Sequence, residues 1–282
     1  MPSVRMTSFL GVSGKLHLFL LFLLTAFQAH SQEVKTQKII ALAPHLTEIV
    51  YALNMQDKLV AVSEFSDYPQ EASLLPTVAN YQGVNIAEVL RLAPSHILAW
   101  KGGNKQQDID RLRQLGFDIY ESAPETIFDL PSDISQIALF LGVKDSQTLT
   151  NNINNRISHL KTLSKQLASI NVSYLMSLQP LSGAGKDIWI NSLLKLCGLN
   201  NIYHNGLSSY LQINIADLIR QSPHALIAGV SADEDAIRAH FDKHTSVFKP
   251  KVLSVNPDKF HRFTPRVVDE VEKLCQRRKE IY

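Results

Sequence analysis

NIAEVLRLAPSHILAW, the stretch Asn85–Trp100, recurs in the second half of the chain as NIADLIRQSPHALIAG, Asn214–Gly229. Both copies begin with Asn-Ile-Ala and an acid, reach a proline at the same position, and then enter an apolar run. A tyrosine precedes each copy at the same spacing, Tyr81 and Tyr210. A unit of this length, used twice and so far apart, predicts two similar lobes rather than a solenoid of stacked repeats.

Each copy has the local signals of a short helix followed by a strand. Asn85 and Asn214 are good N-cap residues, and the acid three residues on, Glu88 or Asp217, can complete a capping box. The proline ends each helix because the residue before a proline is disfavoured in the α region. The apolar run that follows, His96–Trp100 in the first copy, is typical of a buried parallel strand. Ligands bind at the carboxyl ends of strands in open α/β sheets, so we expect the next loop to border a binding site.

The rest of the chain predicts strands and helices in alternation on both sides of a helical connector. Apolar segments such as Leu59–Ser63 and Ser173–Leu178 indicate buried strands. Between the two halves, apolar residues at spacings of three and four predict a stiff helical connector, with a break at Gly142. We therefore predict an α/β fold with two Rossmann-like lobes joined by a long rigid helix. The expected divisions are a signal peptide at 1–31, an N-terminal lobe at 36–125, a connecting helix at 126–168 and a C-terminal lobe at 169–282.

Composition and the N-terminal segment favour an exported globular protein. The chain is 45% apolar and 19% charged with a net charge of +2, which argues against a nucleic acid as partner. Arg5 and Lys15 precede the apolar run Leu16–Phe27, which is typical of a signal peptide and short for a membrane anchor, the alternative. Small residues before Gln32 indicate cleavage near Ser31. We expect the chain in the periplasm.

Two cysteines, Cys197 and Cys275, lie inside apolar helical patterns. In an exported protein an even pair favours a disulfide, and two buried thiols are the alternative. Neither cysteine has a second cysteine or a histidine at the spacing of metal ligands, so we expect no metal there.

Other function classes have weaker candidates. Gly183–Lys186 looks like the end of a phosphate-binding loop, but Asp187 stands where a Ser or Thr must bind magnesium. We therefore expect a binding protein rather than an enzyme. His240 and His244 lie one helical turn apart and leave a metal-capture protein as an alternative. Their basic neighbours discourage a cation, so we predict no metal site.

Aromatic residues at turns and strand ends are the best candidates for a ligand site: Phe65, Tyr81, Trp100 and Tyr210. Because Tyr81 and Tyr210 are equivalent in the two copies, facing lobes would present them from opposite walls of one cleft. Paired rings can sandwich a large flat ligand. The alternative is that each tyrosine only packs against the start of its own helix.

Four motifs stand out: FSDYP at Phe65–Pro69, YQGVN at Tyr81–Asn85, AWKGGN at Ala99–Asn104 and PDKFHR at Pro257–Arg262. Together they resemble the family of periplasmic cobalamin-binding proteins that supply ABC importers in Gram-negative bacteria. The resemblance covers most of residues 38–278. The Trp-basic-Gly-Gly-Asn loop and the Asp-x-Phe-x-Arg turn are specific, since neither is general to the wider fold.

The resemblance implies a monomeric bilobal binding protein without a cofactor, which holds a corrinoid between its lobes and delivers it to membrane permease subunits. Aromatic rings would cover the apolar surface of the corrin ring, and Asp and Arg would bind its peripheral amides. The implied lining residues are Phe65, Tyr81, Trp100, Tyr210, Asp258 and Arg262. The family's two cysteines form a disulfide, which implies a Cys197–Cys275 bond.

The chain departs from the family pattern at two places. Well-known members have tryptophan at Tyr81 and Tyr210, so the stacking area is smaller here. A haem- or siderophore-binding protein of the same fold, with one of these tyrosines on iron, is therefore the alternative. The family also docks one glutamate per lobe onto its importer, and these align with Ala87 and Ala216. Either the adjacent acids, Glu88 and Asp217, dock instead, or they only cap their helices.

Overall fold

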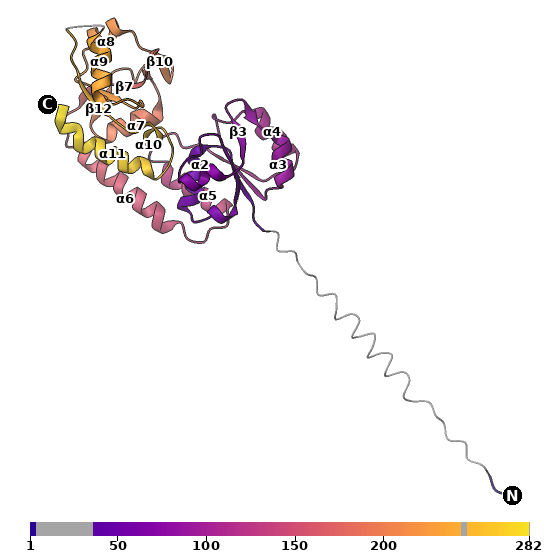
Figure 1. Ribbon diagram of the computed structural model, residues 1–282. Coiled ribbons are helices and arrows are strands. Elements are labelled where there is room, and N and C mark those ends of the chain that lie inside the picture. Colours follow the sequence, from indigo (N-terminus) through magenta and orange to yellow (C-terminus); the bar gives the residue numbers. More distant parts are fainter. Residues whose placement is uncertain (4–35, 244–246, 282) are drawn as a thin grey trace. The chain divides into compact units, whose positions relative to one another are not determined.

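The structure is a computed structural model that describes residues 1–3, 36–243 and 247–281. The chain divides into two units, Met1–Thr36 and Gln37–Tyr282, and both sheets lie in the second (Figure 1). The predicted signal peptide and its cleavage site lie outside the described residues, apart from residues 1–3. In the described part of the chain, no helix has both the length and the apolar character needed to cross a membrane.

The first sheet has six strands in the order β4-β3-β2-β1-β5-β6 (Figure 1). Its neighbours are parallel except for the β3–β4 hairpin, which carries Tyr81 at its turn. The strands are β1 (Ile39–Ala41), β2 (Leu59–Ser63), β3 (Thr77–Asn80), β4 (Gly83–Val84), β5 (His96–Trp100) and β6 (Ile119–Ser122). The helices of this half are α2 (Pro44–Ala52), η1 (Gln56–Lys58), η2 (Gln70–Leu74), α3 (Ile86–Leu92) and α4 (Gln106–Gln114).

The second sheet has the order β10-β8-β7-β11-β12, with β9 also paired to β7. β8 and β10 run antiparallel and were not predicted from the sequence. The strands are β7 (Ile170–Leu178), β8 (Leu181–Ala184), β9 (Leu199–Asn201), β10 (Tyr210–Gln212), β11 (Ala225–Ala228) and β12 (Lys251–Ser254). The helices are α7 (Ile188–Leu196), α8 (Ile215–Gln221), α9 (Glu234–Asp242), α10 (Pro257–Phe260), α11 (Arg266–Arg277) and η3 (Arg278–Ile281).

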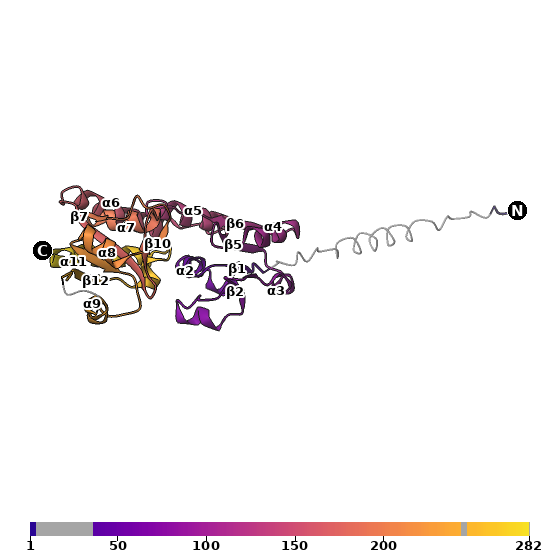
Figure 2. The ribbon, with the colours of Figure 1, turned by 90° about the horizontal axis from the view of Figure 1, so that it is seen from above.

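The connector consists of two helices, α5 (Leu130–Phe140) and α6 (Gln147–Ser164). They are separated at Gly142, whose φ of 71° lies in the left-handed region that favours glycine. α6 packs against α5, α7 and α11, and Figure 2 shows α5 and α6 one after the other. The expected rigid connector is therefore stiffened by packing on its neighbours rather than by one continuous helix.

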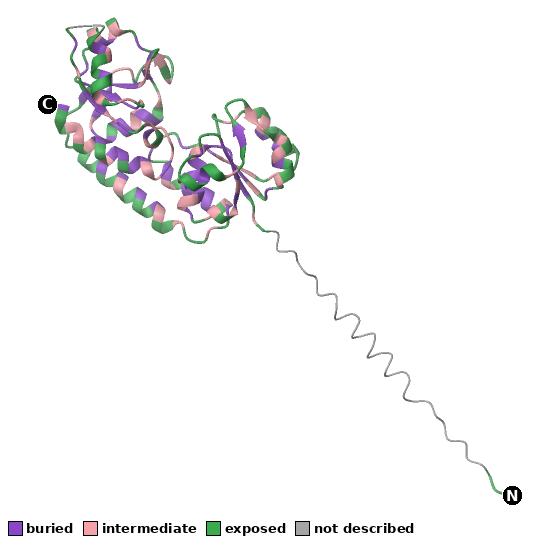
Figure 3. Cartoon of the chain, in the orientation of Figure 1, coloured by how far each residue is buried: buried purple, intermediate pink, exposed green. Residues whose placement is uncertain are grey.

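Both faces of each sheet are buried, as the continuous apolar strands predict. In β1, Ile39 and Ala41 pack into one hydrophobic cluster, whereas Ile40 joins a second cluster on the opposite face. The first cluster continues through the connector into the second sheet, where it includes Val172 and Ile227. Figure 3 shows buried residues along the strands of both sheets. The two lobes and the connector therefore share one hydrophobic cluster, and each lobe has a further cluster of its own.

The two copies of the repeat fold alike. Asn85 and Asn214 cap α3 and α8 as predicted, each accepting a hydrogen bond from a backbone N–H of the first turn. Both helices end at a left-handed residue directly before the proline, Ala93 with φ 47° and Ser222 with φ 45°. The strand that follows, β5 or β11, lies second from the edge of its sheet in both cases.

A disulfide joins Cys197, the C-cap of α7, to Cys275 in α11. This confirms the bond that the resemblance implies and excludes the alternative of two free thiols. The bond fastens the last long helix to the second lobe across a sequence separation of 78 residues.

Candidate functional site

The AWKGGN loop follows the carboxyl end of β5, and its asparagine and glycines determine its conformation. Asn104 accepts a hydrogen bond from the Trp100 N–H at 2.7 Å and donates one to the Leu42 carbonyl at 2.8 Å, so it joins the ends of β5 and β1. Gly102 has φ of 85°. At Gly103 a Cβ atom would lie 1.8 Å from the Trp100 ring. The two glycines and the asparagine therefore fix the position of the Trp100 indole.

Trp100 belongs to an aromatic cluster that joins the two halves of the fold. Its ring lies edge-on to His45 at 5.4 Å between ring centroids and to Phe263 at 5.6 Å. Phe263 also meets Trp189 at 4.4 Å, and the Trp189 Nε1–H donates to the Phe260 carbonyl at 3.0 Å. Sequence reasoning missed this cluster, because nothing in the local patterns pairs residues so distant in the chain.

His45 is a buried polar residue within the aromatic cluster. Its side chain is 3% exposed, and its Nε2 atom has no hydrogen-bond partner among the described residues. Burial, with the nearby charge of Arg262, lowers the pKa of His45 to about 3. The imidazole is therefore neutral at physiological pH.

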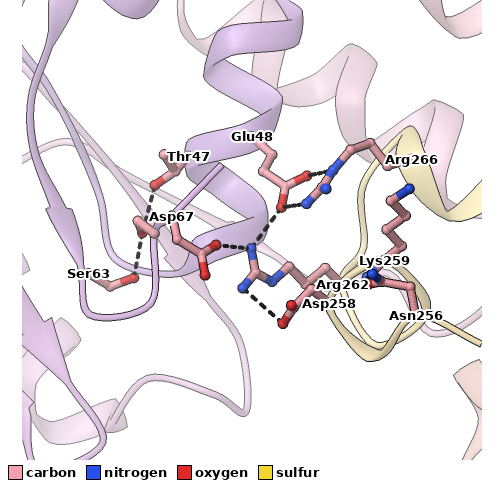
Figure 4. Close-up of polar contacts among 10 residues, drawn as sticks. Thr47, Glu48, Ser63, Asp67, Asn256, Asp258, Lys259, Arg262 and Arg266 are labelled. Carbon is pink, nitrogen blue, oxygen red and sulfur yellow. Dashed lines mark hydrogen bonds and ion pairs between the residues drawn. The ribbon is translucent and has the colours of Figure 1, made fainter. Parts of the chain in front are cut away.

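Arg262 contacts three carboxylates, which come from both halves of the fold (Figure 4). Its Nη1 donates to Glu48 Oε1 at 3.0 Å and to Asp67 Oδ1 at 2.7 Å, and its Nη2 lies 3.4 Å from Asp258 Oδ1. The hydrogen bond from Arg262 holds the pKa of the Asp67 carboxyl below its usual value. The structure thus brings Asp258 and Arg262 together, and it adds Glu48 and Asp67, which sequence reasoning did not assign to the site.

Glu48 is the buried centre of this network. It also accepts two hydrogen bonds from Arg266, from Nε at 2.7 Å and from Nη2 at 2.5 Å. The guanidinium of Arg266 stacks 3.5 Å from the centroid of the Tyr68 ring, which supplies a cation–π contact. A pocket of about 790 Å³ adjoins these three residues. A signal for Glu48 existed in the sequence, since it is the one acidic residue in the segment Pro44–Ala52.

Three predicted aromatic residues are exposed: Phe65 by 69%, Tyr81 by 83% and Tyr210 by 59%. Exposed large apolar side chains are typical of ligand or protein contact sites. Partial burial, together with the negative charge of the nearby Asp187 carboxylate, raises the pKa of Tyr210 to about 12. Among the described residues, no hydrogen bond or ring contact joins Tyr81 or Tyr210 to Trp100, Asp258 or Arg262.

The carboxylates of Glu88 and Asp217 do not make the contacts that a capping box predicts. Each carboxylate turns forward to an arginine on its own helix, Glu88 to Arg91 and Asp217 to Arg220, rather than back to the N–H of the cap. The predicted bond from the acid back to the cap N–H is therefore wrong, because the arginine guanidinium offers the acid a charged donor instead. The predicted N-cap, in which the asparagine side chain accepts a backbone N–H of the first turn, is confirmed.

The metal-capture alternative rests on His240 and His244, of which the structure describes only His240. The His240 ring packs against Phe241 at 5.5 Å between centroids, while His244 lies outside the described residues. Over the part of the chain that the structure describes, no group of three or more His, Cys, Asp or Glu residues is arranged to hold a metal ion.

Comparison with known proteins places the chain in a family. The model of the family described as "Periplasmic binding protein" matches residues 39–248. The chain is 34% identical over 242 residues to the vitamin B12-binding protein of Vibrio cholerae, covering 85% of this chain and 88% of that one. It therefore belongs to the periplasmic binding protein family.

Solved structures agree with this assignment. The crystal structure of the periplasmic vitamin B12-binding protein BtuF of Vibrio cholerae matches with a TM-score of 0.76 and 34% identity, over 87% of this chain and 97% of that one. The periplasmic heme-binding protein RhuT from Roseiflexus sp. RS-1 also matches with a TM-score of 0.76, over 87% and 99%, but at 16% identity. The second match concerns the bilobal fold alone.

Proposed function

We propose that this chain captures cobalamin between its two lobes in the periplasm and delivers it to an ABC importer. The observation that carries the proposal is the 34% identity, over 85% of the chain, to the vitamin B12-binding protein of Vibrio cholerae. In this role the protein works as a monomer that binds and releases its ligand unchanged, without a cofactor of its own. The proposed ligand contacts are Phe65, Tyr81, Trp100, Tyr210, Asp258 and Arg262.

The chemistry of these side chains suits a corrin ring with amide substituents. Trp100 is held by the AWKGGN loop and offers a rigid apolar surface, which limits the entropy lost on binding. The exposed rings of Tyr81 and Tyr210 can cover further apolar area. Arg262 and Asp258 can exchange their mutual contact for hydrogen bonds to ligand amides.

In the same-fold alternative, a haem or siderophore protein, Tyr81 or Tyr210 would ligate iron. A tyrosine binds ferric iron as phenolate, and the pKa of Tyr210 is raised to about 12 by partial burial and by Asp187. Ionising this phenol beside a carboxylate is unfavourable because the two negative charges repel. To ligate iron, Tyr210 would have to ionise next to this negative charge.

Residues 1–31 are the proposed signal peptide, with cleavage near Ser31. The proposed divisions of the exported chain are the lobes 36–125 and 169–282 and the connector 126–168. We assign docking onto the permease subunits to α3 and α8, the helices that carry Glu88 and Asp217.

Calorimetric titration of the purified exported chain with cyanocobalamin, and with haemin in parallel, tests the ligand. We expect one-to-one binding of cyanocobalamin and a loss of at least about tenfold in affinity in a Tyr81→Ala, Tyr210→Ala variant, since each ring contributes about 1 kcal/mol of stacking. Both tyrosines are exposed, so this variant leaves the core intact. Leu207, another exposed apolar residue, provides the matched control, Leu207→Ala, with unchanged affinity. Saturable binding of haemin without binding of cyanocobalamin would refute the proposal.

A further inference from the structure

A pocket of about 760 Å³ lies on the second lobe, between the end of α6 and the outer face of α7. α6 packs against α7, and Figure 2 shows the two helices next to each other. The residues that α7 contributes stand at helical spacings of three and four and are Ile188, Asn191, Ser192 and Lys195. None of the six ligand contacts proposed above, all of them described residues, lines this pocket. The α6–α7 pocket is therefore a separate candidate site.

The charged groups that line the α6–α7 pocket are all basic. They are Lys165, Lys186, Lys195 and His204. Among the residues that the structure describes, no aspartate or glutamate lines the pocket, and none of the three lysine ammonium groups has a hydrogen bond or an ion pair. Positive groups gathered in a concave surface raise the local concentration of anions. The lining therefore favours an anionic ligand.

Two carboxylates lie next to this lining, and both are hydrogen-bonded to the backbone. Asp129 accepts hydrogen bonds from the N–H and from the hydroxyl of Thr126, both at 2.8 Å. Asp187 caps α7 by accepting one from a backbone N–H of the first turn at 2.7 Å. Lys161 adds a further positive charge, 4.8 Å from the centroid of the Phe128 ring. The nearest acids thus stabilise local turns and do not pair with the lysines of the pocket.

The neutral polar groups of the pocket are already hydrogen-bonded within the protein. Asn191 Nδ2 donates to the Gly185 carbonyl at 2.8 Å, and Asn191 Oδ1 accepts from Asn201 at 3.0 Å. The Ser192 hydroxyl donates to a carbonyl of its own helix at 2.7 Å. His204 donates its Nδ1–H to the Asn201 carbonyl at 2.7 Å, because a carbonyl can only accept, and this leaves Nε2 for a ligand. The basic side chains are therefore the main groups with which a ligand can pair.

Apolar side chains border the lysines. Phe128, Leu167 and Ile188 line the pocket and are among the large apolar residues that remain exposed. Exposed apolar side chains beside a few polar groups are typical of a site for an organic ligand. An inorganic anion would leave these three side chains in water. The lining therefore fits an anion that carries an apolar group.

Lys186 ends the sequence Gly183–Lys186, which resembles the end of a phosphate-binding loop but lacks the Ser or Thr that follows. The structure gives its glycines another role. A Cβ atom at Gly183 would lie 2.1 Å from the Tyr174 carbonyl oxygen, and one at Gly185 would lie 2.4 Å from the Ser208 carbonyl oxygen. Close backbone packing therefore requires both glycines. Lys186, by contrast, is exposed and lines the pocket.

We propose that the α6–α7 pocket binds an organic phosphate, through the ammonium groups of its three lysines and through an apolar group that rests on Phe128 and Ile188. A phosphate ester is anionic at neutral pH, and its oxygens accept hydrogen bonds from several ammonium groups at once. Lysine binds phosphate as a point charge, so it tolerates different orientations of the ester. The phosphate comes either from a soluble ester or from a lipid head group.

Calorimetric titration of the purified exported chain tests this with three probes. Octyl phosphate has the anion and the apolar chain, octyl glucoside has the chain with an uncharged head, and inorganic phosphate has the anion alone. We expect one-to-one binding of octyl phosphate, and at least about tenfold lower affinity for the other two probes, since each lacks one kind of contact. Equal affinities for octyl glucoside and octyl phosphate would overturn the inference.

Cyanocobalamin separates this pocket from the proposed cobalamin site. Octyl phosphate should bind equally well with and without saturating cyanocobalamin, because the two sites share no residue. Competition between the two would place octyl phosphate in the cobalamin site and overturn the inference. A chain that binds octyl phosphate but no cyanocobalamin would overturn the proposed function and leave the inference intact.

Lysine variants locate the anion. We expect the triple variant Lys165→Gln, Lys186→Gln, Lys195→Gln to lower octyl phosphate affinity at least about tenfold, and all three side chains are exposed, so the core stays intact. The matched control removes three exposed lysines outside the pocket: Lys144→Gln, Lys251→Gln and Lys279→Gln. Its affinity should stay unchanged. Equal losses in the two triple variants would show that overall charge attracts the anion, which overturns the inference.

An apolar variant and lipid vesicles complete the test. Ile188→Asn should lower octyl phosphate affinity about fivefold and leave inorganic phosphate unaffected, because it removes only apolar contact. Sedimentation with phosphatidylglycerol vesicles but not with phosphatidylcholine vesicles, lost in the triple variant of the pocket, would assign the phosphate to a lipid head group. Octyl phosphate binding without such sedimentation would assign it to a soluble ester. A chain that does not bind octyl phosphate overturns the inference, whatever the vesicles show.

Discussion

Glu48 accepts both hydrogen bonds of the Arg266 guanidinium, at 2.7 and 2.5 Å, although its side chain is only 3% exposed. It lies on α2, in the first lobe, whereas Arg266 begins α11, the last long helix. Arg262 adds a third hydrogen bond to the same carboxylate. One buried acid therefore joins two arginines from the far end of the chain to the first lobe.

Replacing this acid should destabilise the protein strongly. In Glu48→Ala two guanidinium groups, with side chains 12% and 18% exposed, lose their buried partner, so we expect the free energy of unfolding to fall by about 3–5 kcal/mol. Urea denaturation followed by circular dichroism measures the change. The control is Asp235→Ala, which breaks an exposed pair on α9 and should cost less than about 1 kcal/mol. Equal losses in the free energy of unfolding for the two substitutions would mean that the buried network stabilises the protein no more than the exposed pair does.

The buried histidine predicts a pH dependence of stability. The pKa of His45 is lowered to about 3, whereas an unfolded histidine titrates near 6.5. Between these values the unfolded chain binds a proton that the folded chain does not, so this contribution to stability is complete above pH 6.5 and is lost as the pH falls toward 3. His45→Leu should reduce the slope by up to about 1.4 kcal/mol per pH unit in this window.

Urea titrations at several pH values measure that slope. His159→Leu provides the control, because it removes a histidine that is exposed on α6 rather than buried. His261, whose pKa burial also lowers, remains in both variants and cancels from the comparison. A slope that is the same in His45→Leu and in wild type would show that the imidazole is protonated in the folded state.

Much of this fold could be predicted from short sequence patterns, because apolar runs and prolines act on the backbone within a few residues. The strand Leu59–Ser63 has the predicted bounds, since its continuous apolar run is buried on both sides of the sheet. The ends of α3 and α8 follow from the proline in each copy of the repeat. The same signals at Asn85 and Asn214 also predicted the equivalence of the two lobes.

The cross-lobe contacts could not be predicted in the same way. Arg266 and Glu48 are 218 residues apart, and no sequence period relates them. The strands β8 and β10 were missed because both are short, and β8 also contains a serine, a glycine and an alanine, which have weak β-propensity. Of the proposed ligand residues, Arg262 and Asp258 were expected from a motif, but their partner Asp67 became evident only from the contacts in the structure.

Enlarging the exposed rings should strengthen ligand binding. In Tyr81→Trp, Tyr210→Trp the larger indoles offer more stacking area to a corrin ring, and we expect cyanocobalamin affinity to rise about fivefold, or about 1 kcal/mol. Calorimetric titration measures the change. Phe128→Trp is the control, since it enlarges an exposed ring on the connector, outside the proposed site. An affinity that falls in the double variant would indicate that the phenol hydroxyls, rather than ring area, make the contact.

The hydrogen bond between Asp67 and Arg262 predicts competition between a protein carboxylate and the ligand. Arg262 is engaged with three carboxylates, so binding a corrinoid amide requires it to release at least one of them. Asp67 and Asp258 are the two that can leave, because their side chains are 56% and 63% exposed whereas Glu48 is buried, and of these two only Asp258 is itself a proposed ligand contact. We therefore expect Asp67→Asn to raise cyanocobalamin affinity by up to about fivefold, since an exposed pair is worth at most about 1 kcal/mol.

Asp258→Asn is the matched comparison, because it also removes one carboxylate from Arg262 but changes a proposed ligand contact. It should lower the affinity, in the opposite direction to Asp67→Asn. If both substitutions weaken binding to a similar extent, Asp67 positions the guanidinium for the ligand and does not compete with it. The network would then be a preformed part of the site, in which Arg262 binds the ligand with its carboxylate partners still in place.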